Sequence, residues 1–184
     1  ILRAYDIRGI YQDTLTEADA HAIGMAFVAT LRQRGHGVTV AVGRDGRLSS
    51  PVLAAALIDG LVQAGGEVRN IGCGPTPMLY FAGVTWQCDG AIQVTGSHNP
   101  PTHNGFKMVM NGKSFFGNDI QQLGQISAAG VANEDGGTVT ETAIFDDYVN
   151  RLLQQADAGD LSIVWDCGNG AAGPATVAMT QKLR

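Results

Sequence analysis

Short apolar stretches of strand length alternate along this chain with longer stretches that have helical periodicity. Residues 17–34 place apolar side chains on one broad helix face, and the apolar run 38–42 follows. Ser50, expected as an N-cap, and Pro51 in the first turn predict a second helix that ends near residue 64, before a strand at 67–71. Strands separated by helices are typical of an α/β domain with a mostly parallel sheet, whose ligand-binding loops meet at one edge.

The same alternation continues along the rest of the chain. We expect a short helix at 78–82, strands at 90–94 and 106–110, a turn at Asn111-Gly112, helices at 119–129 and 144–155, and a loop or hairpin over the polar stretch 130–142. A second unit is predicted to begin with a strand at 161–165, a glycine-rich turn at 166–173 and a helix from Pro174 to Arg184. The predicted domains are therefore 1–156 and 157–184.

Composition places the chain among ordinary globular proteins and argues against several function classes. The chain is 45% hydrophobic and 16% charged with a net charge of −5, which disfavours a general nucleic-acid surface. No apolar run approaches the roughly 20 residues of a membrane span, so we expect no membrane partner. Cys73, Cys88 and Cys167 are scattered, which fits a reducing cytoplasmic compartment better than a disulfide or zinc framework.

The most distinctive part of the sequence is VTGSHNPPTH, residues 94–103. It places Ser97 just after an apolar strand, with Gly96 before it, His98 and Asn99 after it, and then two prolines that prevent a regular strand. A serine hydroxyl at a strand end, beside an imidazole, can carry a covalent group, and we expect that group to be a phosphoryl. Taken alone, a serine–histidine pair is more often an ordinary turn with local hydrogen bonds.

Cationic side chains elsewhere in the sequence suit a phosphate ligand. Lys107 follows Gly105-Phe106 at the start of a strand, and its ammonium could balance phosphate or move protons on a sugar hydroxyl. Arg8 can bind phosphate through two parallel hydrogen bonds, although an edge strand with an Asp6–Arg8 ion pair explains the same residues.

Two glycine-rich loops precede helix starts. The loop GRDGR, which contains Arg44, Asp45 and Arg47, could bind an anion, or its arginines could brace the neighbouring loop through the Asp45 carboxylate. The second loop, GNGAAG at 168–173, fits the dinucleotide pattern GxGxxG, but we interpret it as a tight strand-to-helix turn that opens the second unit. We do not expect a metal pair at His98 and His103, because no third ligand follows at a suitable spacing.

Together these motifs resemble the α-D-phosphohexomutase superfamily, and most of all its bacterial phosphomannomutase/phosphoglucomutase branch. The specific motifs are TGSHNP and NGFK, preceded in family order by YDIRG, GRDGRLSSP and GCGPTPMLYF, and the resemblance runs from about Arg3 through Gly173. It implies the family's domain I, a three-layer α/β/α sandwich around a mostly parallel mixed sheet. It also implies an intramolecular phosphotransferase that moves a phosphoryl group reversibly between the 1- and 6-positions of mannose or glucose.

The resemblance also assigns roles to individual residues. Ser97 matches the serine that is phosphorylated in the resting enzyme and that exchanges its phosphoryl group with a hexose phosphate through a hexose 1,6-bisphosphate intermediate. A Mg²⁺ ion is expected to touch this phosphate. The resemblance places further residues at the transfer centre and the substrate site, namely His98, Lys107, Arg8 and Tyr5. Residues expected to support the site are Arg44, Asp45, Asn99 and Asn104.

The sequence departs from the family pattern in what it lacks. It contains neither the DGDxDR-type loop that supplies the aspartate ligands of magnesium nor the sugar-recognition and phosphate-binding loops of the family's third and fourth domains. We therefore expect domain I plus the start of domain II, inactive without the remaining domains of its own chain. Two alternatives stay open: a nucleotide-binding oxidoreductase fragment built on residues 168–173, and a non-catalytic sugar-phosphate binding module. A serine hydrolase is disfavoured because no GxSxG elbow is present.

Overall fold

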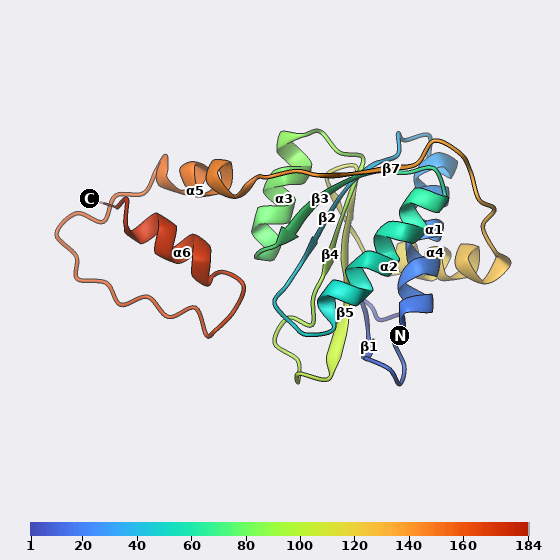
Figure 1. The fold of residues 1–184 in the computed structure, drawn as a ribbon, viewed down its shortest axis with the longest axis horizontal. Helices are drawn as coiled ribbons and strands as arrows, with labels where there is room; N and C mark the ends of the chain where they lie inside the picture. Colours follow the sequence, from blue (N-terminus) through green and yellow to red (C-terminus); the bar gives the residue numbers. More distant parts are fainter. Residues whose placement is uncertain (184) are drawn as a thin grey trace.

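The computed structural model describes residues 1–183, which are organised around one mixed β-sheet (Figure 1). Within that range the sheet has seven strands in the order β1-β5-β4-β2-β3-β7, with β6 paired to β5. Parallel pairing joins β4 (Gly90–Val94), β2 (Thr39–Arg44), β3 (Glu67–Cys73) and β7 (Thr138–Glu141). Antiparallel pairing adds β1 (Ile7–Ile10), β5 (His103–Met110) and β6 (Lys113–Phe115).

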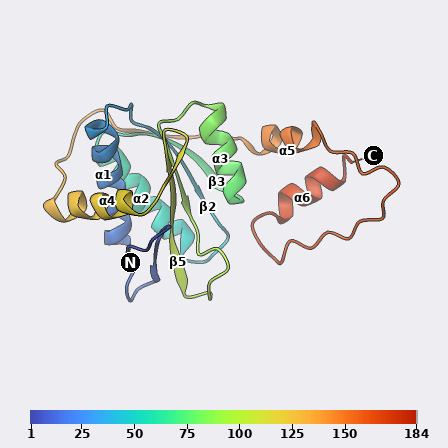
Figure 2. The ribbon, with the colours of Figure 1, turned by 180° about the vertical axis from the view of Figure 1, so that it is seen from behind.

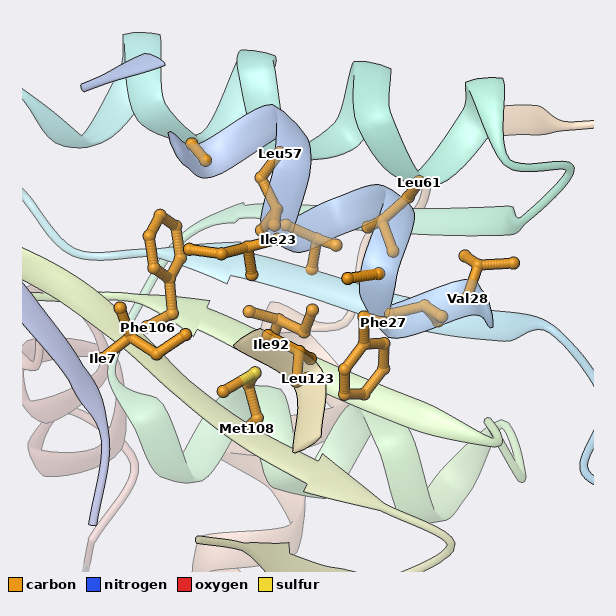
Figure 3. Packing of buried hydrophobic residues seen from close by; sticks show 14 of the residues in the cluster. Ile7, Ile23, Phe27, Val28, Leu57, Leu61, Ile92, Phe106, Met108 and Leu123 are labelled. Atoms are coloured by element: carbon orange, nitrogen blue, oxygen red, sulfur yellow. The ribbon is translucent and has the colours of Figure 1, made fainter. Parts of the chain in front are cut away.

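Helices cover both faces of this sheet, which confirms the predicted α/β/α sandwich. On one face lie α1 (Glu17–Gln33), α2 (Ser50–Gln63) and α4 (Asn118–Ala129), and on the other lies α3 (Thr76–Thr85) (Figures 1 and 2). The main core fills the space between the first three helices and the sheet, where Phe27, Leu57 and Ile92 are fully buried (Figure 3). Each such side chain contributes about 1.5–3 kcal/mol on burial. This core fixes the strand and helix ends from which the loops of the site emerge.

Local signals predict one connection correctly and misplace the start of one helix. The turn expected at Asn111-Gly112 is confirmed, because both residues have positive φ (48° and 70°) and join β5 to β6 as a type I′ hairpin does. The expected N-cap of α2 is wrong by one residue. Ser49 precedes the helix without a side-chain cap bond, and the Ser50 hydroxyl donates instead to Asp45 Oδ1. The Ser50 hydroxyl therefore contacts Asp45, in the loop between β2 and α2, and does not cap the helix.

The polar stretch 130–142, expected as a loop or hairpin, contains a strand of the sheet. Its strand β7 pairs in parallel with β3, with Val139 opposite Val68. All the residues of β7 are exposed, so the apolar pattern that marks a buried strand is missing from this edge. A polar edge strand of this kind is held by backbone pairing rather than by packing.

The strand expected at 161–165 does not form. No strand of the described residues pairs with this segment, and its apolar side chains face solvent, with Val164 97% exposed. A strand must satisfy its backbone N–H and C=O groups with a neighbour, and an apolar sequence alone does not supply one. The helix expected from Pro174 is confirmed as α6 (Gly173–Thr180), which is shorter than predicted, and Arg184 lies outside the described residues.

The last two helices lie beside α3, on its side away from the sheet (Figures 1 and 2). A separate hydrophobic cluster joins α3 to α5 (Phe145–Leu153) and α6, with Met78, Tyr148 and Ala175 buried in it. Burial raises the pKa of the Tyr148 hydroxyl.

No helix in residues 1–183 has the length and apolar character needed to cross a membrane.

Candidate functional site

Ser97 lies in the loop that connects β4 to β5, at the edge of the sheet where β2 also ends. Its φ of 53° falls in the left-handed region, which is uncommon for a residue other than glycine. Its N–H donates to Thr95 Oγ1 at 2.9 Å, and its exposed hydroxyl lies 3.2 Å from His98 Nδ1. The expected serine–histidine pair is therefore formed and faces solvent. A left-handed residue costs about 1–2 kcal/mol, so other contacts must hold this loop.

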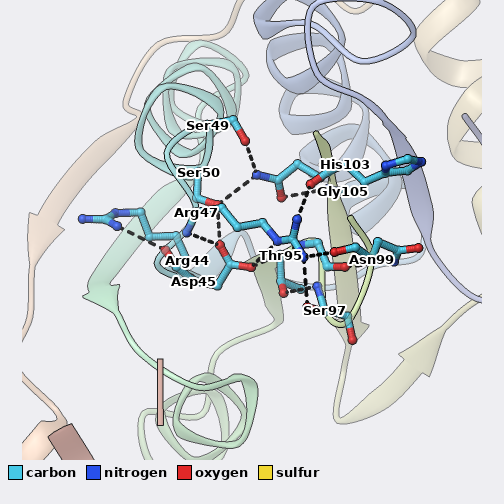
Figure 4. Close-up of polar contacts among 12 residues, drawn as sticks. Arg44, Asp45, Arg47, Ser49, Ser50, Thr95, Ser97, Asn99, His103 and Gly105 are labelled. Atoms are coloured by element: carbon cyan, nitrogen blue, oxygen red, sulfur yellow. Dashed lines mark hydrogen bonds and ion pairs between the residues drawn. The ribbon is translucent and has the colours of Figure 1, made fainter. Parts of the chain in front are cut away.

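Arg47, from the loop after β2, supplies those contacts. Its Nη1 donates to the carbonyl oxygens of Pro100 at 2.6 Å and His103 at 3.0 Å. Its Nη2 donates to the carbonyl oxygens of Ser97 at 3.1 Å and Asn99 at 2.6 Å. Figure 4 shows the guanidinium at the centre of this arrangement. One side chain thus ties together the whole turn that carries Ser97.

Asp45 holds both Arg47 and the start of the serine loop. Its Oδ2 lies 3.5 Å from Arg47 Nε and accepts a hydrogen bond from the Gly96 N–H at 3.0 Å. Its Oδ1 accepts hydrogen bonds from the Arg47 N–H at 3.0 Å and from the Ser50 hydroxyl. Of the two interpretations of the GRDGR loop, this geometry supports the brace. Arg44 extends away from Arg47 (Figure 4) and lines a separate groove between α2 and β7.

Gly96 and two asparagines complete the brace. A Cβ added at Gly96 would lie 2.3 Å from Arg47 Nε, so the close approach that the sequence predicted at this glycine is made by the arginine. Asn99 Nδ2 donates to the Gly96 carbonyl at 2.9 Å. Asn104 is fully buried, and its Nδ2 donates to the hydroxyls of Ser49 at 2.8 Å and Ser50 at 2.9 Å. Both asparagines therefore support the loop by hydrogen bonding inside the protein.

Arg8 and Lys107 meet at a second carboxylate, Asp6, which is only 8% exposed. Asp6 Oδ2 lies 2.5 Å from Arg8 Nη2 and 3.6 Å from Lys107 Nζ. No hydrogen bond or ion pair of the described residues joins either cation to Ser97. Lys107 lies opposite Gln93, which is four residues before Ser97 in the chain. The backbones of Lys107 and Ser97 are therefore at most about 19 Å apart, counting 3.3 Å per residue along the chain and about 5.5 Å across the strand pair. The structure thus forms two polar groups, one around Ser97 and one around Asp6, and no hydrogen bond or ion pair between side chains of the described residues joins them.

Tyr5 is 80% exposed, and its ring stacks on the half-exposed ring of Phe116 with the centroids 6.4 Å apart. The Gly117 N–H also donates to the Ala4 carbonyl at 2.8 Å, so the start of α4 holds the segment that carries Tyr5. Sequence reasoning missed Phe116, since a single aromatic residue after a short strand gives no signal of its own. The pair leaves an open aromatic surface beside Asp6.

A cavity of about 700 Å³ opens beside Ser97. Arg47, Thr76 at the start of α3, Gln93 and the glycine-rich turn 168–172 also line it. Gln93 is 1% exposed, and within residues 1–183 its Oε1 has no hydrogen-bond partner. The glycine-rich turn therefore lies near the candidate site, but no strand precedes it in the described chain. The dinucleotide fingerprint requires that strand, so the structural context of the pattern is missing.

The residues of this site do not form a metal centre by themselves. Residues 1–183 contain no group of three or more His, Cys, Asp and Glu side chains that could hold a metal ion. Both oxygens of Asp45 already accept hydrogen bonds from the brace. A phosphate on Ser97 would be the one ligand that this part of the chain offers to the expected Mg²⁺. A single ligand does not complete the coordination sphere of the ion.

Comparison with known proteins agrees with this architecture. A family model described as phosphoglucomutase/phosphomannomutase, alpha/beta/alpha domain I, matches residues 1–133. The chain belongs to this family. The match confirms the superfamily that the sequence motifs resemble, and it assigns residues 1–133 to the family's domain I.

Individual phosphoglucomutase/phosphomannomutase proteins match over nearly the whole chain. The phosphomannomutase/phosphoglucomutase of Pseudomonas aeruginosa PAO1 is 42% identical over 174 residues, covering 94% of this chain and 37% of that protein. The phosphomannomutase of Salmonella typhimurium is 37% identical over 191 residues, covering 99% of this chain and 41% of that protein. A crystal structure of a family protein from Burkholderia thailandensis gives a TM-score of 0.88 at 41% identity, covering 97% of this chain and 41% of that one. The chain thus spans about two fifths of the length of these relatives.

Proposed function

We propose that Ser97 is the phosphoryl carrier of a phosphohexomutase that interconverts hexose 1-phosphates and hexose 6-phosphates. The observation that carries this proposal is the placement of Ser97: its exposed hydroxyl lies 3.2 Å from His98 Nδ1, on a loop braced by Arg47 and Asp45. A group that accepts and releases a phosphoryl must be both accessible and fixed in position. The names of the relatives, phosphomannomutase and phosphoglucomutase, support a hexose phosphate as the substrate.

The reaction begins with Ser97 phosphorylated. A hydroxyl of the hexose phosphate attacks the phosphorus atom, the bond between phosphorus and Ser97 Oγ breaks, and the hydroxyl proton passes to a base. The product of this half-reaction is a hexose 1,6-bisphosphate. In the second half-reaction the other phosphoryl group returns to Ser97 Oγ, and a proton returns to the sugar oxygen that it leaves. The net result is an isomerisation, and the phosphoserine is restored.

Charge balance decides which residues serve this transfer. A phosphoserine carries about −1.5 to −2 charges, and catalysis of phosphoryl transfer depends mainly on balancing charge at the transferring oxygens. We assign the charge-balancing role to Arg8 and the acid–base role to Lys107, both held at Asp6. His98 and Tyr5 are proposed to contact the substrate. The Ser97 phosphate would be a ligand of Mg²⁺, whose charge would help to balance that of the phosphate, and no step here is routed through the ion.

A coupled assay of the complete protein tests the proposal. The protein is supplied with glucose 1-phosphate or mannose 1-phosphate, Mg²⁺ and a trace of the 1,6-bisphosphate, and formation of the 6-phosphate is followed. We expect turnover with at least one of the two sugars, and conversion of neither would contradict the proposal. Residues 1–184 alone should give negligible turnover, because they lack the DGDxDR-type loop. Turnover by residues 1–184 near the rate of the complete protein would refute this requirement for further domains.

The two alternatives predict different outcomes in simple measurements. An oxidoreductase should bind NAD in a calorimetric titration, and we expect no binding. A non-catalytic module should bind hexose phosphates without converting them, so the coupled assay separates it from a mutase.

A further inference from the structure

Arg47 makes contacts that differ from the usual role of arginine in phosphate proteins. Arginine normally places its planar N–H donors on a carboxylate or a phosphate. Here the two terminal nitrogens donate to the carbonyl oxygens of Ser97, Asn99, Pro100 and His103, and Nε faces Asp45. The side chain is only 17% exposed. Its donors are therefore committed to the protein, and its charge is paired with a carboxylate.

We infer that Arg47 is a positioning residue for phosphoryl transfer, which acts by turning the His98 N–H toward the phosphoryl group on Ser97. This inference rests on the proposed function. In a planar trans peptide the C=O and the following N–H point in opposite directions. The Ser97 carbonyl points at Arg47, so the His98 N–H points away from it. Within the described residues this N–H has no hydrogen-bond acceptor, in contrast to the neighbouring Ser97 and Asn99 amides.

The two prolines fit the same arrangement. The carbonyls of Asn99 and Pro100 are also turned toward Arg47, and the amides that follow them belong to Pro100 and Pro101. Proline has no N–H, so no unsatisfied donor results at either position. Between residues 97 and 101 of the described chain, the His98 amide is thus the one backbone donor left for a ligand. A fixed N–H beside the reacting hydroxyl is suited to stabilise negative charge on phosphoryl oxygens.

Lysine cannot replace arginine in this role. A lysine ammonium has three donors at a single point, whereas the guanidinium spreads its donors over a planar fork that reaches carbonyls on two sides. The close packing of Gly96 against Arg47 also suits a flat group. Arg32 is a matched control, because its guanidinium also donates to backbone carbonyls, those of Ala64 at 2.6 Å and Gly65 at 3.4 Å, and pairs with Glu134 at 2.8 Å. These contacts lie at the C-terminal end of α2, whereas the loop that carries Ser97 lies at its N-terminal end.

The test compares Arg47→Ala, Arg47→Lys and Arg32→Ala in the complete protein. A displacement of about 1 Å at a reacting group costs about 10²-fold in rate. We expect both Arg47 variants to lose about 10²-fold in kcat with KM changed far less, and Arg32→Ala to keep the wild-type kcat. Added guanidinium should restore part of the Arg47→Ala rate, and methylammonium should not. In amide NMR, phosphorylation of Ser97 should shift the His98 N–H strongly downfield in the wild type but not in Arg47→Ala.

Circular dichroism first establishes that each variant is folded. A folded Arg47→Ala or Arg47→Lys protein with the wild-type kcat would overturn the inference, and so would equal rescue by methylammonium. If Arg47→Ala does not fold, Arg47→Lys alone decides by the same kcat criterion. A wild-type protein without isomerase activity would refute the proposed function instead. In that case the response of the His98 amide to inorganic phosphate, in the wild type and in Arg47→Lys, tests the loop arrangement separately, and equal shifts would overturn it.

Discussion

Two stretches of this chain have the same local sequence pattern, a short apolar run followed by a glycine-containing loop, yet they differ in structure. Residues 90–94 form β4, which is entirely buried between β2 and β5. Residues 161–165 are exposed and form no strand, and they have no strand partner in the described chain. The apolar pattern is therefore the same in both stretches, but only the first forms a strand. Whether a strand forms depends on a neighbour that the local sequence does not contain.

The loops that follow these two stretches differ in the same way. Arg47 and Asp45, from the end of a different strand, hold the loop after β4 by hydrogen bonds across about 50 positions of sequence. In the described residues the hydrogen bonds of the later loop are local. They run from the Gly168 N–H to Asp166 Oδ1 at 2.8 Å, from the Gly170 N–H to the Cys167 carbonyl at 2.9 Å and from the Gly173 N–H to the Gly170 carbonyl at 3.1 Å. A reacting hydroxyl must be fixed in position, and hydrogen bonds from a distant part of the chain provide this for the loop after β4. We therefore expect substitutions in the two regions to differ sharply.

The largest difference should appear between two serines. Ser97→Ala in the complete protein should abolish incorporation of labelled phosphate from hexose 1,6-bisphosphate, because the acceptor oxygen is removed. Ser162→Ala, which changes an exposed serine of the second stretch, should leave incorporation unchanged. Undiminished labelling of the Ser97→Ala protein would show that Ser97 does not accept the phosphoryl group.

The next difference concerns two lysines. Lys107→Met should lower turnover by about 10²–10⁴-fold, since acid–base groups contribute on that scale, while changing the melting temperature little. Lys182→Met should change neither quantity, because within residues 1–183 the one polar contact of the exposed Lys182 ammonium is with Asn150 Oδ1 at 3.5 Å. Turnover and thermal unfolding of both variants check this. A large drop in melting temperature with turnover intact would give Lys107 a structural role.

Packing should separate the two stretches in stability as well. Ile92→Ala removes a fully buried side chain of β4 and should lower the free energy of unfolding by about 2–5 kcal/mol. Val164→Ala, at a side chain that is 97% exposed, should change it by less than about 0.5 kcal/mol. Urea denaturation of residues 1–184 measures both. A Val164→Ala effect as large as that of Ile92→Ala would show that the second stretch is packed in solution.

The smallest difference is expected between two half-buried cysteines. Burial raises the pKa of the Cys88 thiol, with the Asp89 carboxylate adding to the effect and Arg69 opposing it. The thiolate is the reactive form, so at pH 8 a smaller fraction of Cys88 is reactive than of a cysteine with the ordinary thiol pKa. We expect iodoacetamide to modify Cys88 more slowly than Cys167, as followed by peptide mass spectrometry. Faster modification of Cys88 would show that the sheet region opens more readily than the C-terminal stretch.

The sequence was sufficient for most of the fold because its helices and buried strands carry strong periodic signals. Residues 17–34 and 90–94 are examples, and both predictions are confirmed. Two failures have physical causes. Strand β7 is polar and exposed, so no apolar pattern marks it, and residues 161–165 have the pattern but lack a partner.

At the site, the sequence predicted the Ser97–His98 contact but left the role of the GRDGR loop open. Only the structure shows which carbonyls Arg47 reaches, because these contacts join residues about 50 positions apart. The unpartnered oxygen of Gln93 was likewise invisible in the sequence, where it is one polar residue within an apolar strand. Contacts between distant loops depend on side-chain geometry, and local patterns do not encode that geometry.

Phosphopeptide mapping by mass spectrometry is the most direct test of this account. The complete wild-type protein is incubated with hexose 1,6-bisphosphate, digested and searched for phosphate on every serine, threonine and histidine. The account predicts a single added phosphate on the peptide that contains Ser97. An actively isomerising protein with its phosphate on another residue, or with none, would contradict it.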